Sequence, residues 1–262
     1  MTKAISVVKV SGHCLDDHDL IEQFARAVGQ ADEQIVIVHG GGVEISQLQR
    51  KLNIEPRYVD GLRVTDADSL ALVEMVLCGS VNKRLVRYLL AVGVDAQGLS
   101  GVDRGLIRAR KMRHQTLDMQ FTGEVVSVRG DVIVDLLDRD VTPVIAPVSV
   151  GARSNYNLNA DPVASAIAAA IGANTVVFIS NVAGVYVDDE LASSLTRTQA
   201  LELIERGVIQ GGMIPKVESA LDVLSSGVPR AVITDLPGWT KRGGTTFTGT
   251  EAESSVSEGL CQ

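Results

Sequence analysis

The stretch Ile35-Val36-Ile37-Val38-His39-Gly40-Gly41-Gly42 is a short apolar run that ends in three glycines. An apolar run of this length, rich in Val and Ile and bounded by glycine, predicts a strand that is buried on both faces. Residues Val43 to Leu52 then carry a helical pattern. A similar unit precedes them, because a predicted strand at Ile5 to Val10 ends in Ser11-Gly12, and a helix is expected from about Asp17 to Val28. Two strand–glycine–helix units in succession are typical of a parallel sheet that binds ligands at the carboxyl ends of its strands.

The composition supports this α/β class. The 262 residues are 45% hydrophobic but only 3% aromatic. The core is therefore expected to consist of Val, Leu, Ile and Ala, as in parallel sheets that are covered by helices. The length fits one large α/β domain or two small lobes.

The net charge and the cysteine content restrict the cellular compartment and the classes of binding partner that we expect. The formal net charge of −8 argues against nucleic acid, which calls for a basic face. Cys14, Cys78 and Cys261 show no CxxC or metal-ligand spacing, which favours a reduced, cytoplasmic setting. We find neither a secretory leader nor an apolar run of the ~18 residues that a membrane span needs. We therefore expect a cytoplasmic protein without nucleic-acid or membrane partners.

The pattern predicts further elements along the chain. Tyr58 to Val64 reads as a hairpin or irregular segment, and a long helix is expected from Thr65 to about Val92, with a bend near Gly79. The other predicted strands are Ala96–Leu99, pieces of Leu106–Val128, Val144–Ala146, Thr175–Ile179 and Arg230–Thr234, and the other helices are Val132–Leu137, Thr198–Arg206 and one that ends near Ser225. The last ten residues are expected to be disordered.

A second polar stretch, Asn157-Leu158-Asn159-Ala160-Asp161, stands directly before an almost purely apolar run from Val163 to Ile171. Asn or Asp in this place is a helix start signal, and Pro162 is tolerated in a first helical turn. Taken alone, the stretch is either a helix cap or part of an anion site beside the positive end of a helix.

Two lysines point to the second of these alternatives. Lys9 lies inside an apolar strand, where an unpaired ammonium is costly to bury. Lys216 follows Gly211-Gly212 near a helix start, where a cation gains nothing from the helix dipole unless an anion is also present. Asp161 is a natural partner for both ammonium groups. With the glycine loops, whose backbone N–H groups can approach anions closely, these residues suggest phosphoryl transfer, which needs mainly positioning and charge neutralisation.

Six motifs then identify a resemblance. They are Val8-Lys9-Val10-Ser11-Gly12, Val36-Ile37-Val38-His39-Gly40-Gly41-Gly42, Gly61-Leu62-Arg63-Val64-Thr65, Asn157-Leu158-Asn159-Ala160-Asp161, Ser180-Asn181-Val182-Ala183-Gly184-Val185 and Gly212-Met213-Ile214-Pro215-Lys216. Because these motifs occur in the order that is usual for the family, the chain resembles the amino acid kinase family, and most closely its members that phosphorylate N-acetylglutamate. The resemblance covers about Ile5 to Thr234. The resemblance implies an α/β three-layer open sandwich with a mainly parallel central sheet. It also implies an N-terminal lobe (1–175) for the acyl amino acid and dimerisation, and a C-terminal lobe (176–262) for ATP.

The resemblance also implies roles for single residues. Lys9 and Lys216 would stabilise the transferring phosphoryl group and Asp161 would orient them. The substrate would be held by Gly40, Gly41, Arg63 and Asn157, with the guanidinium and the amide on its α-carboxylate. ATP would contact Gly12, Asn181, Gly184, Tyr186, Val208, Ile209 and Gln210.

The chemistry implied is ATP-dependent phosphorylation of the side-chain carboxylate of N-acetyl-L-glutamate, in arginine biosynthesis. That carboxylate is already ionised at pH 7, so no general base is required. Mg²⁺ would bridge ATP oxygens and needs no protein metal motif, because it often relies on phosphates and water.

Three positions depart from the pattern and leave alternatives. Ser11 replaces a usual Gly, as in the uridylate kinase branch, Val43 replaces a Pro, and Asn181 replaces an Asp. Asn181, together with Leu99-Ser100-Gly101 and the stretch Cys78-Gly79-Ser80-Val81-Asn82-Lys83, resembles the sequences of kinases that act on carrier-protein-bound aminoadipate or glutamate, and these form the first alternative. A non-catalytic amino-acid sensor on a kinase fold is the second, although a sensor needs no set of Lys9, Asp161 and Lys216. The chain starts directly at the first strand, without the N-terminal helix of arginine-inhibited hexamers, so the resemblance suggests a homodimer.

Overall fold

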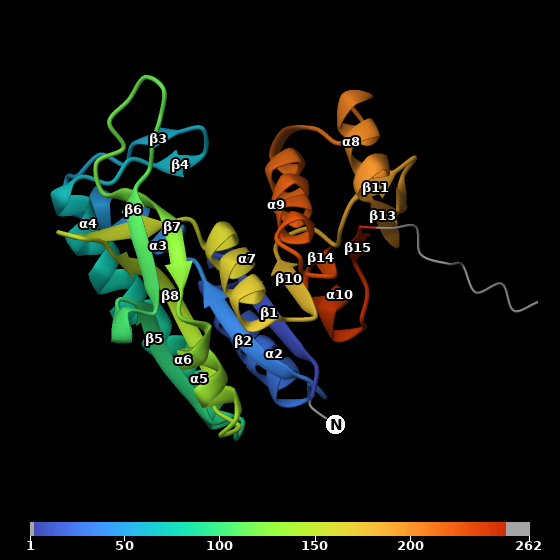
Figure 1. The fold of residues 1–262 in the computed structure, drawn as a ribbon, viewed down its shortest axis with the longest axis horizontal. Helices are drawn as coiled ribbons and strands as arrows, with labels where there is room; N and C mark the ends of the chain where they lie inside the picture. The colour runs from blue at the N-terminus through green and yellow to red at the C-terminus, as the bar shows by residue number, and fades with distance from the viewer. Residues whose placement is uncertain (1–2, 250–262) are drawn as a thin grey trace, which may run out of the picture.

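The structure, a computed structural model, describes residues 3–249. The tail expected to be disordered and Cys261 lie outside the described residues. A single large sheet forms the middle layer (Figure 1). Its strands, in spatial order, are β13 (Ser194–Thr196), β15 (Thr245–Thr248), β14 (Arg230–Thr234), β10 (Thr175–Ile179), β1 (Ile5–Val10), β2 (Gln34–His39), β8 (Thr142–Val150), β6 (Ile107–Lys111), β7 (Thr122–Val128) and β9 (Asn155–Leu158), with β5 (Ala96–Gly101) paired to β8.

The centre of this sheet is parallel. β1 pairs in parallel with β10 and with β2, and β2 pairs in parallel with β8. Within the described part of the sheet, antiparallel pairs occur at β14–β15, β6–β7 and β8–β9. The predicted class, an α/β three-layer sandwich with a mainly parallel sheet, is confirmed.

Helices cover both faces of the sheet, as the apolar strands require. One face carries α6 (Gly130–Leu137), α7 (Ala160–Ile171), α8 (Arg197–Glu205) and α9 (Ile214–Ser225), whose buried residues share one core cluster. The other face carries α2 (His18–Gly29), α3 (Gly42–Lys51), α4 (Ala67–Glu74), α5 (Asn82–Ala91) and α10 (Leu236–Thr240), around a second cluster. We call these the α7 face and the α5 face. Figure 1 shows the C-terminal elements from β10 to β15 gathered at one side of the molecule.

Short elements connect the layers. They are α1 (Gly12–Leu15), the 3₁₀ turns η2 (Asp103–Gly105) and η3 (Gly211–Met213), and the two-stranded hairpins β3 (Tyr58–Val59) with β4 (Leu62–Arg63) and β11 (Tyr186–Val187) with β12 (Glu190–Leu191). The hairpin expected at Tyr58 to Val64 is therefore present. The strand β15 and the helix α10 were not predicted, because their sequences, which contain Gly, Pro and Thr, show neither the hydrophobic repeat of a helix nor the alternation of a strand.

Caps fix where the main helices begin. Asp17 accepts hydrogen bonds from the backbone N–H groups of Asp19 and Leu20 at the start of α2. Asn159 accepts from the N–H of Asp161 at the start of α7, which confirms the predicted helix start. Such caps satisfy N–H groups that have no partner inside the helix.

The long helix expected from Thr65 to Val92 is present, but it is not α-helical throughout. Met75–Val81 forms a π-helix, η1, between α4 and α5, and Gly79 lies within it. A π-helical turn often marks a functional region. Here η1 carries Leu77 and Val81 against the Gly40–Gly42 loop.

A boundary between residues 175 and 176 would fall within β10. Because β10 pairs with β1 on one side and with β14 on the other, one sheet runs through both predicted lobes. The division into an acyl amino acid lobe and an ATP lobe stays a prediction. Within residues 3–249, no helix combines the length and the apolar character that crossing a membrane requires.

Candidate active site

The carboxyl end of β1 carries an ion pair between Lys9 and Asp161. Lys9 Nζ lies 2.8 Å from Asp161 Oδ1, and the two side chains are 17% and 21% exposed. Side chains alternate along a strand, so Lys9 shares the α7 face with Val7. Asp161 reaches it from the first turn of α7, where a carboxylate is favoured by the helix dipole. The pair therefore holds an ammonium group at the mouth of the sheet without leaving a buried charge unpaired.

Lys216 lies near this edge but on another element. It is the third residue of α9, and its Nζ is 3.5 Å from the carbonyl oxygen of Gly212. Among the described residues, no ion pair joins Lys216 to Asp161, so the structure brings Asp161 to one of the two predicted ammonium groups. The Lys216 ammonium, only partly buried, thus stands at a helix start, where an anion would be attracted.

Two glycine loops lie against each other beside Lys9. A Cβ added to Gly12 would lie 3.5 Å from Gly41 Cα and 3.5 Å from Gly42 N. Gly41 packs tightly on its other side, because a Cβ there would lie 2.6 Å from Leu77 Cδ2. The absence of side chains therefore lets the two loops and η1 meet, and it leaves backbone N–H groups at the start of α3 without a side-chain cap.

Arg63 on β4 lies close to this loop. The side chain is 8% exposed, and burial lowers the pKa of its guanidinium. Nη2 donates to the Gly42 carbonyl oxygen at 3.0 Å and to Ser46 Oγ at 2.8 Å. Further partners are the Tyr58 hydroxyl and Gln49 Oε1. The guanidinium is thus held in one orientation before any ligand is bound.

Asn157 on β9 is joined to the same region through threonines. Its Nδ2 donates to Thr65 Oγ1 at 3.0 Å. Thr122 Oγ1 donates to the carbonyl oxygen of Arg63 and contacts Thr65 Oγ1 at 3.2 Å. These bonds link β9, β7 and the segment after β4, so residues that are far apart in the sequence become neighbours.

A pocket of about 500 Å³ contains most of the residues predicted to contact ATP. It is lined by Asn181, Val182, Ala183, Gly184, Val185, Tyr186, Val208, Ile209, Gln210, Met213 and Asp235. Gly12, which was predicted with them, does not line it. Met213 and Asp235 were missed, although Asp235 directly follows the predicted strand Arg230 to Thr234. Its position at the carboxyl end of a predicted parallel strand, where α/β sheets bind ligands, could have identified Asp235 as a site residue.

Gly184 shapes this pocket because its backbone needs the absence of a side chain. Its φ is +152°, and a Cβ would lie 2.5 Å from Thr245 Oγ1. That hydroxyl accepts from the N–H of Val185 at 2.8 Å and donates to the carbonyl oxygen of Ala192 at 2.7 Å. The Ser180–Val185 loop is therefore anchored to β15, a strand at the far end of the sequence.

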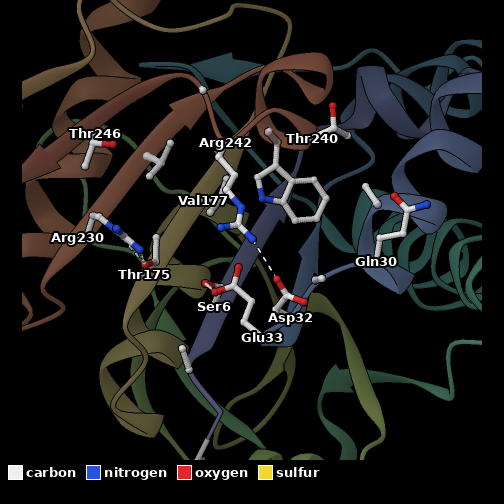
Figure 2. A pocket seen from close by; sticks show the side chains of 16 residues that line it. Ser6, Gln30, Asp32, Glu33, Thr175, Val177, Arg230, Thr240, Arg242 and Thr246 are labelled. Atoms are coloured by element: carbon white, nitrogen blue, oxygen red, sulfur yellow. Dashed lines mark hydrogen bonds and ion pairs between the residues drawn. The ribbon is translucent and has the colours of Figure 1, made fainter.

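Figure 2 shows another pocket, of about 630 Å³, at the opposite end of the sheet. Ser6, Thr175 and Arg230, which line it, belong to the amino ends of β1, β10 and β14. An ion pair between Arg242 and Asp32 crosses it at 3.0 Å, with both side chains more than 80% exposed. This pocket shares no residue with the predicted site.

Metal-binding capacity is limited in the described part of the chain. Within residues 3–249, no group of three His, Cys, Asp or Glu side chains could hold a metal ion. Of the carboxylates at this edge of the sheet, Asp161 is engaged with Lys9, and Asp235 caps α10 by accepting a hydrogen bond from the N–H of Gly238. The side chains near the site therefore fit a cation that is held mainly by a ligand's own oxygens and water, and do not fit a protein cage.

The fold has three layers, with an open α/β sheet in the middle and a lysine–carboxylate pair and glycine loops at the carboxyl edge of that sheet. This combination is typical of a class of phosphotransferases. The chain belongs to the amino acid kinase family, whose sequence model matches residues 4–235.

Within this family, the chain is similar to relatives that carry one particular name. The chain is 50% identical over 242 residues to the acetylglutamate kinase of Roseiflexus sp. (strain RS-1), which covers 92% of this chain and 93% of the relative. It is 45% identical over 246 residues to the acetylglutamate kinase of Chloroflexus aurantiacus (strain ATCC 29366 / DSM 635 / J-10-fl), covering 93% and 96%. Its fold is similar to the crystal structure of smu.665 from Streptococcus mutans UA159, with a TM-score of 0.81, 31% identity, and coverage of 94% and 99%.

Proposed function

We propose that this chain is an acetylglutamate kinase. It transfers the γ-phosphoryl group of ATP to the side-chain carboxylate of N-acetyl-L-glutamate and forms N-acetylglutamyl 5-phosphate, a step of arginine biosynthesis. The observation that carries this proposal is the 45–50% identity, over more than nine tenths of each chain, to relatives named acetylglutamate kinase. These relatives do not favour the carrier-bound substrate or the sensor alternative.

Lys9, Asp161 and Lys216 are the proposed catalytic residues. An oxygen of the substrate carboxylate forms a bond to the γ-phosphorus while the bond from that phosphorus to the β–γ bridging oxygen breaks, and the electron pair leaves with ADP. Negative charge spreads over the transferring group and the leaving oxygen, so two ammonium groups stabilise the transition state. The 2.8 Å contact with Asp161 supports this role for Lys9, because it holds the ammonium in place. No proton is removed from the carboxylate, which is ionised at pH 7.

Arg63, Asn157, Gly40 and Gly41 are the proposed substrate-binding residues. The α-carboxylate would accept hydrogen bonds from the Arg63 guanidinium, which is already oriented by four protein oxygens. A planar guanidinium binds a carboxylate in two places at once. The amide of Asn157 would hold the same group from β9, and the glycine amides would face the reacting oxygens.

ATP is proposed to occupy the pocket of about 500 Å³, with its base near Tyr186 and Ile209 and its phosphates toward Gly12. Mg²⁺ bound to the phosphates would neutralise charge on them, held by phosphate oxygens and water. We further propose a homodimer that works in the cytoplasm.

The proposed function is tested with MgATP and free N-acetyl-L-glutamate, by measuring ADP release and trapping the acyl phosphate with hydroxylamine. Formation of the hydroxamate is expected. Free glutamate and UMP serve as negative substrates. ADP release with UMP alone would refute the proposal in favour of a nucleotide kinase. Absence of turnover unless the substrate is attached to a carrier protein would refute it in favour of the carrier-bound class.

A further inference from the structure

Two buried polar side chains form a hydrogen-bonded pair beneath the Gly40–Gly42 loop. His39, the last residue of β2, is 0% exposed, and Asn82, the first residue of α5, is 1% exposed. Asn82 Nδ2 donates to His39 Nε2 at 3.0 Å. His39 Nδ1 lies 3.0 Å from the carbonyl oxygen of Gly40. A buried histidine thus connects an amide on α5 to the first peptide of the glycine loop.

The partners of Asn82 fix its orientation. Nδ2 also donates to the carbonyl oxygen of Val144 at 2.9 Å, and Oδ1 accepts from Lys83 Nζ at 3.1 Å. Because a carbonyl oxygen only accepts and an ammonium only donates, the amide cannot be turned over without losing both bonds. His39 Nε2 must therefore accept, and Nδ1 must carry the proton that is donated to Gly40.

The charge state of His39 agrees with this tautomer. The pKa of the imidazole is lowered to about 4, mainly by burial and to a smaller extent by the positive charges of Arg84 and Lys83, while the bond to the Gly40 carbonyl acts in the opposite direction. The ring is therefore neutral at pH 7, with one donor and one acceptor nitrogen.

The bond to Gly40 determines where the N–H of Gly41 points. Residues 3–249 contain no cis peptide bond, and in a trans peptide the N–H points opposite to the carbonyl group. His39 lies on the α5 face, because side chains two residues apart on a strand point to the same side, and Ile35 and Ile37 of β2 pack on that face. The N–H of Gly41 is therefore directed away from the α5 face, and Lys9 lies on the other face. In the described part of the chain, no acceptor receives this N–H.

We propose that Asn82 and His39 are positioning residues that hold the Gly40–Gly41 peptide so that the Gly41 N–H donates to an oxygen of the reacting anion. This inference rests on the proposed function and adds two residues to its site. A peptide between two glycines rotates easily, because neither neighbour has a Cβ. Rotation would replace a donor by a carbonyl oxygen that repels the anion. The tautomer set by Asn82 opposes that rotation.

Two substitutions of His39 separate positioning from packing. The side-chain nitrogen of Asn can occupy the place of Nδ1, whereas that of Gln occupies the place of Nε2. His39→Asn can therefore still donate to Gly40, and His39→Gln cannot. We expect His39→Gln to lose about tenfold or more in kcat, with KM for ATP little changed, and His39→Asn to stay closer to the wild type. If packing alone mattered, the order would be reversed, because Gln fills more of the space of the ring.

The kinetic comparison uses the hydroxylamine assay with free N-acetyl-L-glutamate, and urea unfolding reports the stability of each variant. His18→Asn, at an exposed histidine, is the control for the substitution itself. A kcat for His39→Asn that is equal to or below that of His39→Gln would overturn the inference. A loss of kcat that simply follows the loss of stability would do the same.

The tautomer gives a readout that does not depend on turnover. Two-bond ¹H–¹⁵N correlations of the histidine rings, with His39 assigned from the His39→Asn variant, are expected to show the proton on Nδ1 in the wild type. Asn82→Ala removes the donor to Nε2 and is expected to make the tautomers mix. A wild-type proton on Nε2 would overturn the positioning role. If the wild type formed no hydroxamate, the proposed function would fail, and this measurement would still decide how His39 holds Gly40.

Discussion

Replacing Gly41 by Ala tests how closely the glycine loop and η1 are packed. A Cβ at this position would lie 2.6 Å from Leu77 Cδ2 and 3.2 Å from Val81 Cγ2. Leu77 and Val81 are 2% and 1% exposed, so neither side chain can move into solvent. Either the loop moves away from η1 or the two side chains leave their preferred rotamers. Overpacking of this kind costs about 1–3 kcal/mol of unfolding free energy.

The assay is urea unfolding followed by fluorescence. Trp239 is the single tryptophan of the chain, and its ring stacks on Phe24 with centroids 5.6 Å apart. Trp239 packs against the same core cluster that contains Leu77 and Val81, so its emission reports on the half of the core that the added methyl group disturbs. Gly42→Ala is the matched control, since its Cβ would have only Arg63 Nη2 near it, at 4.0 Å. We expect the control to change stability by about 0.5 kcal/mol or less.

A double-mutant cycle identifies the cause. Leu77→Val deletes the δ carbons that the new methyl group would meet, so Gly41→Ala should cost less in that background than in the wild type. A coupling energy of about 1 kcal/mol or more is expected for residues in direct contact. If Gly41→Ala unfolded within about 0.5 kcal/mol of the wild type, or if the cycle showed no coupling, the packing argument would be refuted.

Three further predictions concern catalysis, pH and the nucleotide pocket. Lys9→Ala and Lys216→Ala should each lower kcat by orders of magnitude with modest changes in KM, whereas Arg63→Ala should act mainly on KM for the acyl amino acid; steady-state hydroxamate kinetics check this, and equal effects of all three on KM alone would contradict it. Burial lowers the pKa of His39 to about 4, from about 6.5 in the unfolded chain, so the unfolded state binds more protons between these values and stability falls as the pH falls through this window. Between pH 7.5 and 5 the wild type should lose about 2 kcal/mol more than His39→Gln in urea unfolding, and parallel pH profiles would count against a neutral buried ring. Gly184→Ala would place a Cβ 2.5 Å from a threonine hydroxyl at a φ of +152°, so it should weaken ATP binding measured by calorimetry; an unchanged Kd would show that the loop does not shape that pocket.

The sequence was sufficient for the central architecture because its signals are local. The apolar runs of β1 and β2 have the length and composition of buried parallel strands, and each is followed by glycine. The start of α7 was predicted from Asn159 and Asp161, since a cap acts within one helical turn. The residues predicted to contact ATP were grouped by the resemblance to the amino acid kinase family, and all of them except Gly12 line one pocket.

Only the tertiary structure decided which polar groups meet. Asp161 of α7 forms an ion pair with Lys9 of β1, whereas the same carboxylate was expected to contact the Lys216 ammonium group as well. The bond between His39 and Asn82 joins positions that are 43 residues apart, and neither residue carries a local signal for the other. β15 was missed because its pairing with β14, not its own sequence pattern, makes it a strand.

The physical reason is the range of the interactions. Hydrophobic periodicity, capping and glycine conformation act over a few residues and are therefore written in the sequence. Ion pairs and buried hydrogen bonds depend on distances of about 3 Å between atoms that chain topology brings together. The sequence by itself determined the parallel centre of the sheet, the main helices that cover it and the glycine loops at its carboxyl edge. The packed fold determined which lysine receives the carboxylate and which peptide the buried histidine holds.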